Sequence, residues 1–219
     1  MTDVPTSCPA LSPWWRHSTI LALVFGLSVL IYLATRTYRD APPIPERAVD
    51  HTGTTVFTGE DVRNGQEVFL RYGLMENGTV WGHGAYLGPD FSAAYLHRLL
   101  DDAAEASAAT RYTRRLATLD TAERQSVDTD VRELLRQNRY DARTGVLTFT
   151  DAEAQSYHQQ VHAWSEYFSQ SVTSAGLTAR YIDDANALHR LTAFFAWTAW
   201  ASIAPRPGTL HSYTNNFPY

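Results

Sequence analysis

The sequence contains a single cysteine among its 219 residues, and this scarcity excludes several classes of site. One thiol cannot form an internal disulfide, a cysteine-based zinc site or an iron–sulfur cluster. Covalent attachment of a c-type haem is excluded as well, because it requires the sequence C-x-x-C-H. Cys8 itself lies in the N-terminal tail without a neighbouring base, so nothing in the sequence favours a nucleophilic role for it.

The chain also lacks an excess of positive charge. It has 18 basic and 23 acidic residues, a formal net charge of -5 and an isoelectric point near 5.9. Proteins that bind nucleic acid replace its counterions with a basic surface, so no nucleic-acid partner is expected. With 44% hydrophobic and 12% aromatic residues the chain is also too apolar to be disordered, and its length allows one or two domains.

Only one long hydrophobic run is present, which excludes a membrane protein with several spans. Residues 20–34 carry no charge, and with their polar neighbours they approach the roughly 20 residues that cross a hydrocarbon core. We predict an N-terminal tail over residues 1–17 and a retained transmembrane helix over residues 18–36, with membrane lipid as a partner. A cleaved signal peptide is the alternative. Arginines flank the run on both sides, so charge leaves its orientation open.

The rest of the chain is predicted to be mainly helical. Closely spaced prolines at positions 42, 43 and 45 indicate an extended, Pro-rich linker over residues 37–56. A domain over residues 57–205 and a second linker over residues 206–219 follow. Helix starts are expected at Thr58 (with Asp61), Ser92, Thr150 (with Glu153) and Asp183 or Asp184. The last of these helices carries an aromatic run too short to span a bilayer, so we expect it to be buried. Gly145 and residues 146–149 predict a small β-hairpin.

One helix carries a pair of histidines at metal-binding spacing. His158 and His162 stand four residues apart, which places both imidazoles on one helical face. No third ligand follows at a matching spacing. The alternative, a pair of exposed or hydrogen-bonded histidines, is the stronger interpretation from sequence.

A glycine-rich stretch over residues 73–89 follows the first helix of the domain. A glycine-led helix, a loop and a Gly-Pro-Asp segment appear in the order found at the start of a cytochrome c. The five positions where C-x-x-C-H would fall are Leu74, Met75, Glu76, Asn77 and Gly78, which supply neither thiols nor an iron-ligating histidine. The space of a lost haem is costly unless it is filled. We expect aromatic side chains to fill it: Trp81, Tyr86, Trp164, Phe194, Phe195, Trp197 and Trp200.

With these motifs the chain resembles the N-terminal region of quinol-dependent nitric oxide reductase. The similar segments include W-G-H-G-A-Y-L-G-P-D-F-S over residues 81–92 and L-T-A-F-F-A-W-T-A-W over residues 191–200. The others are residues 38–47, 57–63, 68–78, 95–98, 206–208 and 212–219. Residues 103–180 are similar only in general character.

The resemblance implies one transmembrane helix followed by a cytochrome c-like domain without haem. This chain would then be the structural and docking part of an enzyme that reduces two NO to N2O and water, and would hold no cofactor and no catalytic residue itself. Haem b and non-haem iron would belong to a multi-helix catalytic portion, the expected partner, which also meets quinol. The implied location is the bacterial inner membrane, with the domain on the periplasmic side.

The resemblance also implies one candidate metal site. In the two-subunit relatives the Gly-x-Gly-Ala-Tyr loop helps to bind a calcium ion, and the matching positions here are Gly84, through its carbonyl, and Tyr86. The alternative is a tight turn that packs Tyr86 into the core. An alternative function is a membrane-tethered sensor that uses the former haem space as a ligand pocket.

Overall fold

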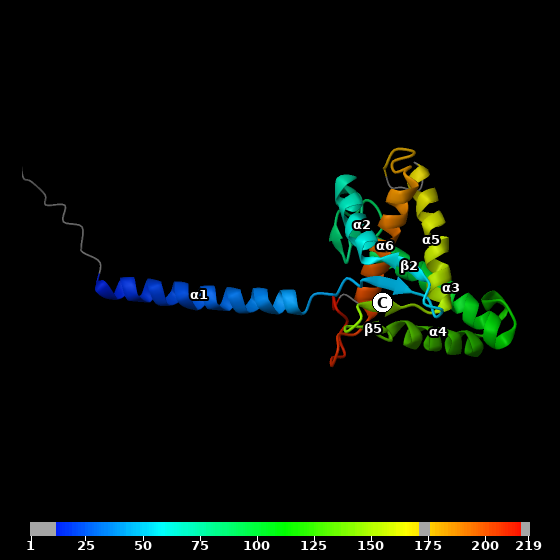
Figure 1. Cartoon of the computed structure of the whole chain (residues 1–219), viewed down its shortest axis with the longest axis horizontal. Coiled ribbons are helices and arrows are strands. Elements are labelled where there is room, and N and C mark those ends of the chain that lie inside the picture. Colours follow the sequence, from blue (N-terminus) through cyan, green and yellow to red (C-terminus); the bar gives the residue numbers. More distant parts are fainter. Residues whose placement is uncertain (1–11, 171–175, 216–219) are drawn as a thin grey trace, which may run out of the picture. The chain divides into compact units, whose positions relative to one another are not determined.

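The computed structural model describes residues 12–170 and 176–215, and it divides into two compact units, Met1–Ala41 and Pro42–Tyr219. The first unit holds the helix α1, and the second holds the other described helices and strands (Figure 1). Helices dominate and the sheets are small, which confirms the mainly α fold expected from the sequence.

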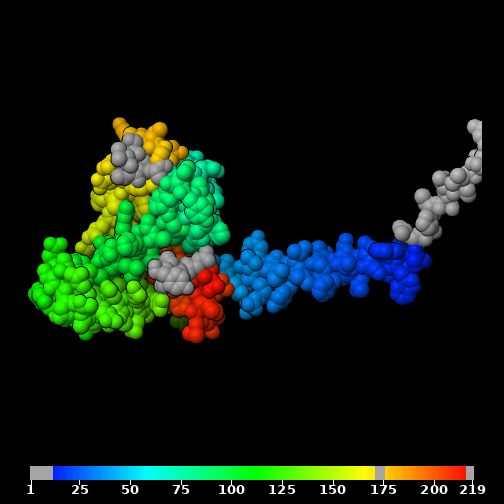
Figure 2. All heavy atoms as spheres, turned by 180° about the vertical axis from the view of Figure 1, so that it is seen from behind, coloured from blue at the N-terminus to red at the C-terminus, as the bar shows by residue number. Residues whose placement is uncertain are grey.

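The first unit is a single helix, α1, over Pro13–Arg39. The Ser12 side chain caps it by accepting a hydrogen bond from the Trp14 amide, and Pro13 stands in the first turn, where its missing N–H costs nothing. Its 27 residues give a length of about 40 Å, and none of its side chains is buried (Figure 2). By length and composition α1 is able to cross a membrane, and the predicted span over residues 18–36 lies inside it.

Local capping signals set the starts of the helices in the second unit. The predicted pair Thr58 and Asp61 forms a capping box at the start of α2, Gly59–Arg71. Asp184 caps α6, Ala185–Ile203, as expected. The remaining helices are α3 (Phe91–Tyr112), α4 (Thr121–Arg136), α5 (Asp151–Ser169) and the short 3-10 helices η1 (Leu74–Glu76) and η2 (Leu116–Thr118). The start of α3 differs slightly from expectation, because Asp90 rather than Ser92 supplies the cap.

Helix α6 lies at the centre of the second unit. Nearly all of its side chains from Ala187 onward are buried, which confirms the expected buried aromatic helix. It packs against α2, α3 and α5, and Figure 1 shows it between α2 and α5. The crossing with α2 is close, because a Cβ on Gly65 would lie 2.0 Å from the Arg190 carbonyl oxygen. Glycine at this position therefore lets the two helix backbones approach.

The sheet is larger than the predicted hairpin. It has four strands in the order β2-β1-β6-β5, and β1 runs parallel to β6 while the other pairs are antiparallel. The hairpin strands β5 (Tyr140–Asp141) and β6 (Val146–Thr148) lie where the sequence indicates. The added strands are β1 (Arg47–Val49) and β2 (Thr55–Thr58).

The strand β1 and the start of β2 fall within residues 37–56, which the sequence assigns to a linker. Part of that segment is therefore structured. Ile44 packs against the core, and the Trp197 indole nitrogen donates to the Pro43 carbonyl oxygen at 2.9 Å. The prolines keep the chain extended, but a tertiary partner then holds it in place.

The described part of residues 206–219 is also not a free linker. Pro205 and Ser212 form a β-bridge, and the Arg206 Nε donates to the Tyr213 carbonyl oxygen at 3.1 Å. The Tyr213 ring is buried and lies 5.2 Å from the Trp200 ring. The chain therefore folds back onto α6 after that helix ends, while residues 216–219 lie outside the described ranges.

Candidate functional site

The segment between α2 and α3 is a compact loop built around a small hairpin. Its strands β3 (Thr79–Val80) and β4 (His83–Gly84) pair antiparallel across a turn at Trp81 and Gly82. Both turn residues have positive φ, 54° and 76°, as a type I′ turn requires. This conformation is strained for tryptophan. Tertiary contacts hold it, since the Trp81 indole nitrogen donates to the Thr198 carbonyl oxygen at 2.8 Å and its ring packs on Trp197.

Asp90 fastens this hairpin to the start of α3. Its Oδ2 accepts hydrogen bonds from the Thr79 hydroxyl and the Gly82 amide, each at 2.7 Å, while its Oδ1 caps the helix at the Ala93 amide. One carboxylate thus serves as a helix cap and as a loop anchor. The hairpin is therefore held in a fixed position on the helical core.

The five positions that correspond to a haem-attachment motif are packed into this loop. Leu74 is fully buried and Asn77 is nearly so. A Cβ on Gly78 would lie 2.3 Å from the Pro89 carbonyl oxygen, so the backbone is closed tightly there. Met75 and Glu76 are exposed. These residues offer no thiol and no imidazole, so they do not fit a covalently attached haem.

Aromatic side chains fill the interior beside the loop. The Phe91 and Phe195 rings stack with centroids 4.8 Å apart and nearly parallel planes, and the Trp164 ring lies 5.0 Å from Phe195. Five of the seven expected aromatic side chains are buried: Trp164, Phe194, Phe195, Trp197 and Trp200. Trp81 is partly buried against the same core.

Tyr86 departs from that prediction, because 85% of it is exposed. The interpretation that it packs into the core is therefore wrong. Its hydroxyl donates to the Gly82 carbonyl oxygen at 3.3 Å, which turns the ring across the outside of the hairpin. Gly84 has a φ of 139°, and a Cβ there would lie 2.3 Å from the Gly78 carbonyl oxygen. Gly84 is nevertheless exposed, so both candidate calcium ligands lie at the surface of the loop.

An exposed apolar surface surrounds these two residues. We call Leu70, Met75, Tyr86 and Leu87 the loop patch; each is exposed, Leu87 by 72%. Two backbone hydrogen bonds bring its segments together, from the Ala85 amide to the Met75 carbonyl at 2.7 Å and from the Leu87 amide to the Asn77 carbonyl at 3.1 Å. Groups of exposed apolar side chains are typical of interaction sites.

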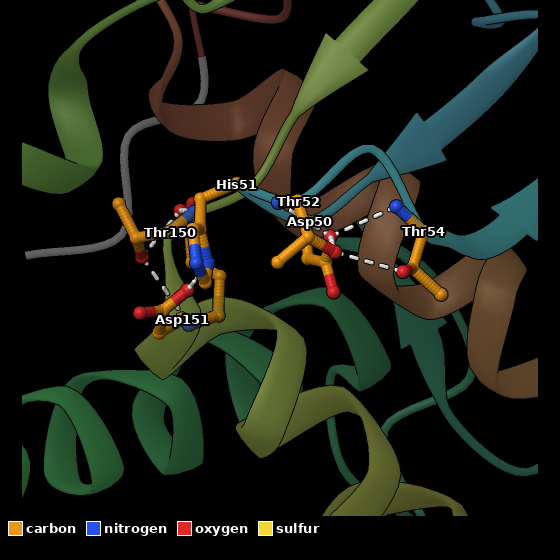
Figure 3. A network of polar contacts seen from close by, with 7 residues as sticks. Asp50, His51, Thr52, Thr54, Thr150 and Asp151 are labelled. Carbon is orange, nitrogen blue, oxygen red and sulfur yellow. Dashed lines mark hydrogen bonds and ion pairs between the residues drawn. The ribbon is translucent and has the colours of Figure 1, made fainter.

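A polar network joins the β1–β2 turn to the start of α5 (Figure 3). The Asp50 carboxylate accepts hydrogen bonds from the Thr52 amide and hydroxyl and from the Thr54 amide, at 2.7 to 2.9 Å. The Thr52 hydroxyl bond is the main reason that the pKa of Asp50 lies below its ordinary value. The His51 Nδ1 pairs with the Asp151 carboxylate. These hydrogen bonds fix the conformation of the β1–β2 turn, and the ion pair attaches the turn to α5. We therefore assign the network a structural role.

The histidine pair predicted on α5 is present and exposed. His158 and His162 lie on the outer face of the helix. Within residues 12–170 and 176–215, no group of three or more histidine, cysteine, aspartate or glutamate side chains is arranged to hold a metal ion. Cys8 lies outside the described residues.

Comparison with known proteins gives one family. A family model for the NorB cytochrome c-like domain of nitric oxide reductase matches residues 45–219, which is most of the chain. A search of curated proteins finds no match. The match begins just before β1 and covers the whole helical core, the loop and its patch.

Proposed function

The chain belongs to the NorB cytochrome c-like domain family of nitric oxide reductase, and from this premise we propose that it is the N-terminal structural and docking part of a membrane-bound, quinol-dependent nitric oxide reductase. The complete enzyme would reduce two NO to N2O and water. Its haem b and non-haem iron would be held by a multi-helix catalytic portion, which would also accept electrons from quinol. This chain would contribute no catalytic residue.

The observation that carries this proposal is the replacement of the haem-attachment positions within a preserved architecture. Leu74 and Asn77 are buried where thiols would be needed, and aromatic rings occupy the neighbouring core. A domain without a covalently attached haem would carry no electrons itself. Quinol oxidation in the membrane portion would then supply them, and the domain would retain a structural role.

The loop patch is the surface that we propose for docking. Its four side chains are apolar and exposed, and the hairpin beneath them is held rigidly by Asp90 and Trp81. A rigid apolar surface loses little conformational entropy on binding. The occupant would be the haem-binding multi-helix portion. In this arrangement α1 anchors the chain in the bacterial inner membrane and the domain lies on the periplasmic side.

The same surface includes the candidate calcium ligands. The Gly84 carbonyl and the Tyr86 phenol are oxygen donors, which calcium prefers, but calcium takes six to eight such ligands. This chain would supply two neutral oxygens there, so the negative charge would have to come from the partner. We therefore propose a calcium ion at the interface, bridging Gly84 and Tyr86 to carboxylates of the catalytic portion.

The sensor alternative requires room for a ligand in the core. The core cavity bordered by Tyr95 and Trp200 has a volume of about 10 Å³. This is room for one water molecule at most, since a cavity needs about 10–15 Å³ to hold one. This cavity therefore does not favour the sensor alternative.

The test is co-purification with the catalytic portion in mild detergent. We expect the double variant Met75→Asp with Leu87→Asp to lose the haem-containing partner and quinol-dependent NO consumption, because two buried carboxylates would face an apolar interface. Leu210→Asp is the matched control, since Leu210 is 99% exposed outside the patch. The chain contains no lysine, so cross-linking must use photoreactive or carboxyl-directed reagents.

Calcium chelation and Tyr86→Phe form a second arm of the same experiment. Both are expected to weaken the complex while the isolated chain stays folded. Retention of the partner by the double patch variant, or equal loss in the Leu210 control, would contradict docking through this patch. Unchanged binding after chelation would contradict the calcium bridge alone.

A further inference from the structure

We propose that His158 and His162 form a two-imidazole binding site for a divalent transition-metal ion on the exposed face of α5. This site is separate from the loop patch and does not depend on the proposed function. The proposed reductase function assigns no role to this histidine pair, and the metal site would give it one. The ligands to the ion would be two neutral imidazole nitrogens and water.

The geometry begins with the regularity of the helix. Both residues lie well inside α5, which is helical from Asp151 to Ser169. Side chains four residues apart on a helix have Cβ atoms about 5–6 Å apart. This is the spacing at which two helical histidines share a zinc ion in other sites. The two imidazoles are therefore within reach of one ion by helix geometry alone.

Both imidazoles are available for coordination. They are exposed, and within the described residues neither forms a hydrogen bond or an ion pair with the protein. Three other histidines of the domain have side-chain partners: His51 pairs with Asp151, His97 lies 3.7 Å from Asp101, and His189 meets the Tyr157 hydroxyl. A metal ion would thus not have to displace an existing contact at either ligand.

One of the two ligands lies against a core residue. The His158 ring packs edge-on against the Tyr157 ring, with centroids 5.6 Å apart and planes at 75°. Tyr157 is fully buried, and its hydroxyl is fixed by the His189 Nε2 at 3.1 Å and the His189 carbonyl at 3.2 Å.

The charges of α5 do not repel a cation, although two of its carboxylates are already paired, Asp151 with His51 and Glu153 with Arg139. The sequence of α5 contains no arginine or lysine, and its three carboxylates are Asp151, Glu153 and Glu166. Glu166 stands four residues beyond His162, one further turn along the helix. The Glu166 Oε1 accepts a hydrogen bond from the Gln170 side chain at 2.9 Å. We therefore expect Glu166 to attract the cation through its negative charge and not to bind it as a third ligand.

The ligand type selects the metal class. Imidazole suits zinc, copper and nickel, whereas magnesium and calcium prefer oxygen ligands. With only two protein ligands the site would bind more weakly than structural zinc sites, which use four. We therefore expect a reversible surface site that holds one ion.

The test is a Zn²⁺ titration of the full chain in detergent, without a polyhistidine tag, in competition with a chromophoric chelator. The unmodified chain is expected to bind one equivalent. Either His158→Ala or His162→Ala should weaken binding by at least about tenfold, because even outer partners of metal ligands change affinity by that much. His97→Ala, on the exposed face of α3, is the matched control and should bind as the unmodified chain does.

A further readout separates the site from general surface binding. Cu²⁺ in place of Zn²⁺ should give an electron paramagnetic resonance spectrum with two nitrogen ligands, and one in either variant. Circular dichroism checks that the variants fold. Equal affinity in all four chains, or a calcium affinity exceeding that for zinc, would overturn the proposal.

Discussion

At the residue scale, the ion pair of Arg139 and Glu153 joins three elements of the domain, which are the helices α4 and α5 and the strand β6. The Arg139 guanidinium donates to the Glu153 carboxylate at 2.5 Å and to the Leu134 and Thr148 carbonyl oxygens. Glu153 also accepts the capping bonds of Thr150. Burial raises the pKa of Glu153, while Arg139 and the Thr150 bonds oppose that rise. The arginine thus compensates a carboxylate that sits in the core.

Removing the Arg139 side chain should destabilise the folded domain. We expect Arg139→Met to reduce the free energy of unfolding by about 3–5 kcal/mol, because it leaves a buried charge without its partner. Chemical denaturation followed by circular dichroism measures this. Arg143→Met is the matched control, since the Arg143 side chain is 91% exposed, and it should change stability by no more than about 0.5 kcal/mol.

The pH dependence of this variant has a defined sign. A carboxyl whose pKa is raised in the folded state favours folding below its unfolded pKa, and that contribution is lost as pH rises through the folded value. Without Arg139 the pKa of Glu153 should rise further, so the stability deficit of Arg139→Met should be smaller at acidic than at neutral pH. A deficit that grows on acidification would show that Glu153 is not the group left uncompensated.

At the element scale, the crossing of α2 and α6 depends on one glycine. A Cβ on Gly65 would meet the backbone of Arg190 at 2.0 Å and the Phe194 Cβ at 2.8 Å. Both neighbours belong to a helix that is buried along nearly its whole length. The crossing therefore cannot widen without moving the core.

Gly65→Ala is expected to be destabilising despite alanine's better helix propensity. That propensity alone would stabilise α2 by about 1 kcal/mol, whereas overpacking a close contact costs about 1–3 kcal/mol or more. Thermal unfolding gives the sign directly. Gln66→Ala, at the next and exposed position, serves as the control and should be neutral or slightly stabilising. A more stable Gly65→Ala variant would mean that the helices do not cross this closely.

The elements also show which parts of the fold local sequence can predict. The capping boxes at Thr58 and Thr150 are visible because the paired residues lie three positions apart. The strand β1 is three residues long and pairs in parallel with β6 about a hundred positions later. No residue near Ala48 indicates that partner. Short strands whose hydrogen bonds are all long-range leave no periodic signal.

At the scale of the whole molecule, the chain joins an exposed apolar helix to a compact helical unit. The unit Pro42–Tyr219 contains the packing contacts between helices and strands on which the core depends. The helix α1 has no buried side chain, so its apolar surface is unexplained by packing within the chain. A membrane would supply the missing apolar surroundings.

Truncation separates these two parts. A chain that begins at Pro42 is expected to stay in the soluble fraction and to keep its helix content, because its core is complete. The full chain should remain with membranes after carbonate extraction. Fractionation followed by circular dichroism tests both expectations. A truncated chain that still sediments with lipid would show that the unit Pro42–Tyr219 binds membranes by itself, and a full chain that extracts freely would contradict the anchor.

The sequence by itself determined the features that depend on residues close to one another. These are the helix starts at Thr58, Thr150 and Asp184, the apolar span of α1, and the absence of thiols and an imidazole at residues 74–78. The candidate calcium ligands Gly84 and Tyr86 came from resemblance, and their role stays a prediction. Only the tertiary structure decided that Tyr86 lies outside the core, that β1 joins β6, and that Trp81 keeps a positive φ. The pairing of β1 with β6 and the backbone of Trp81 depend on partners far away in the chain. No local pattern encodes which distant surface a side chain will meet, or that Tyr86 will meet none in the core.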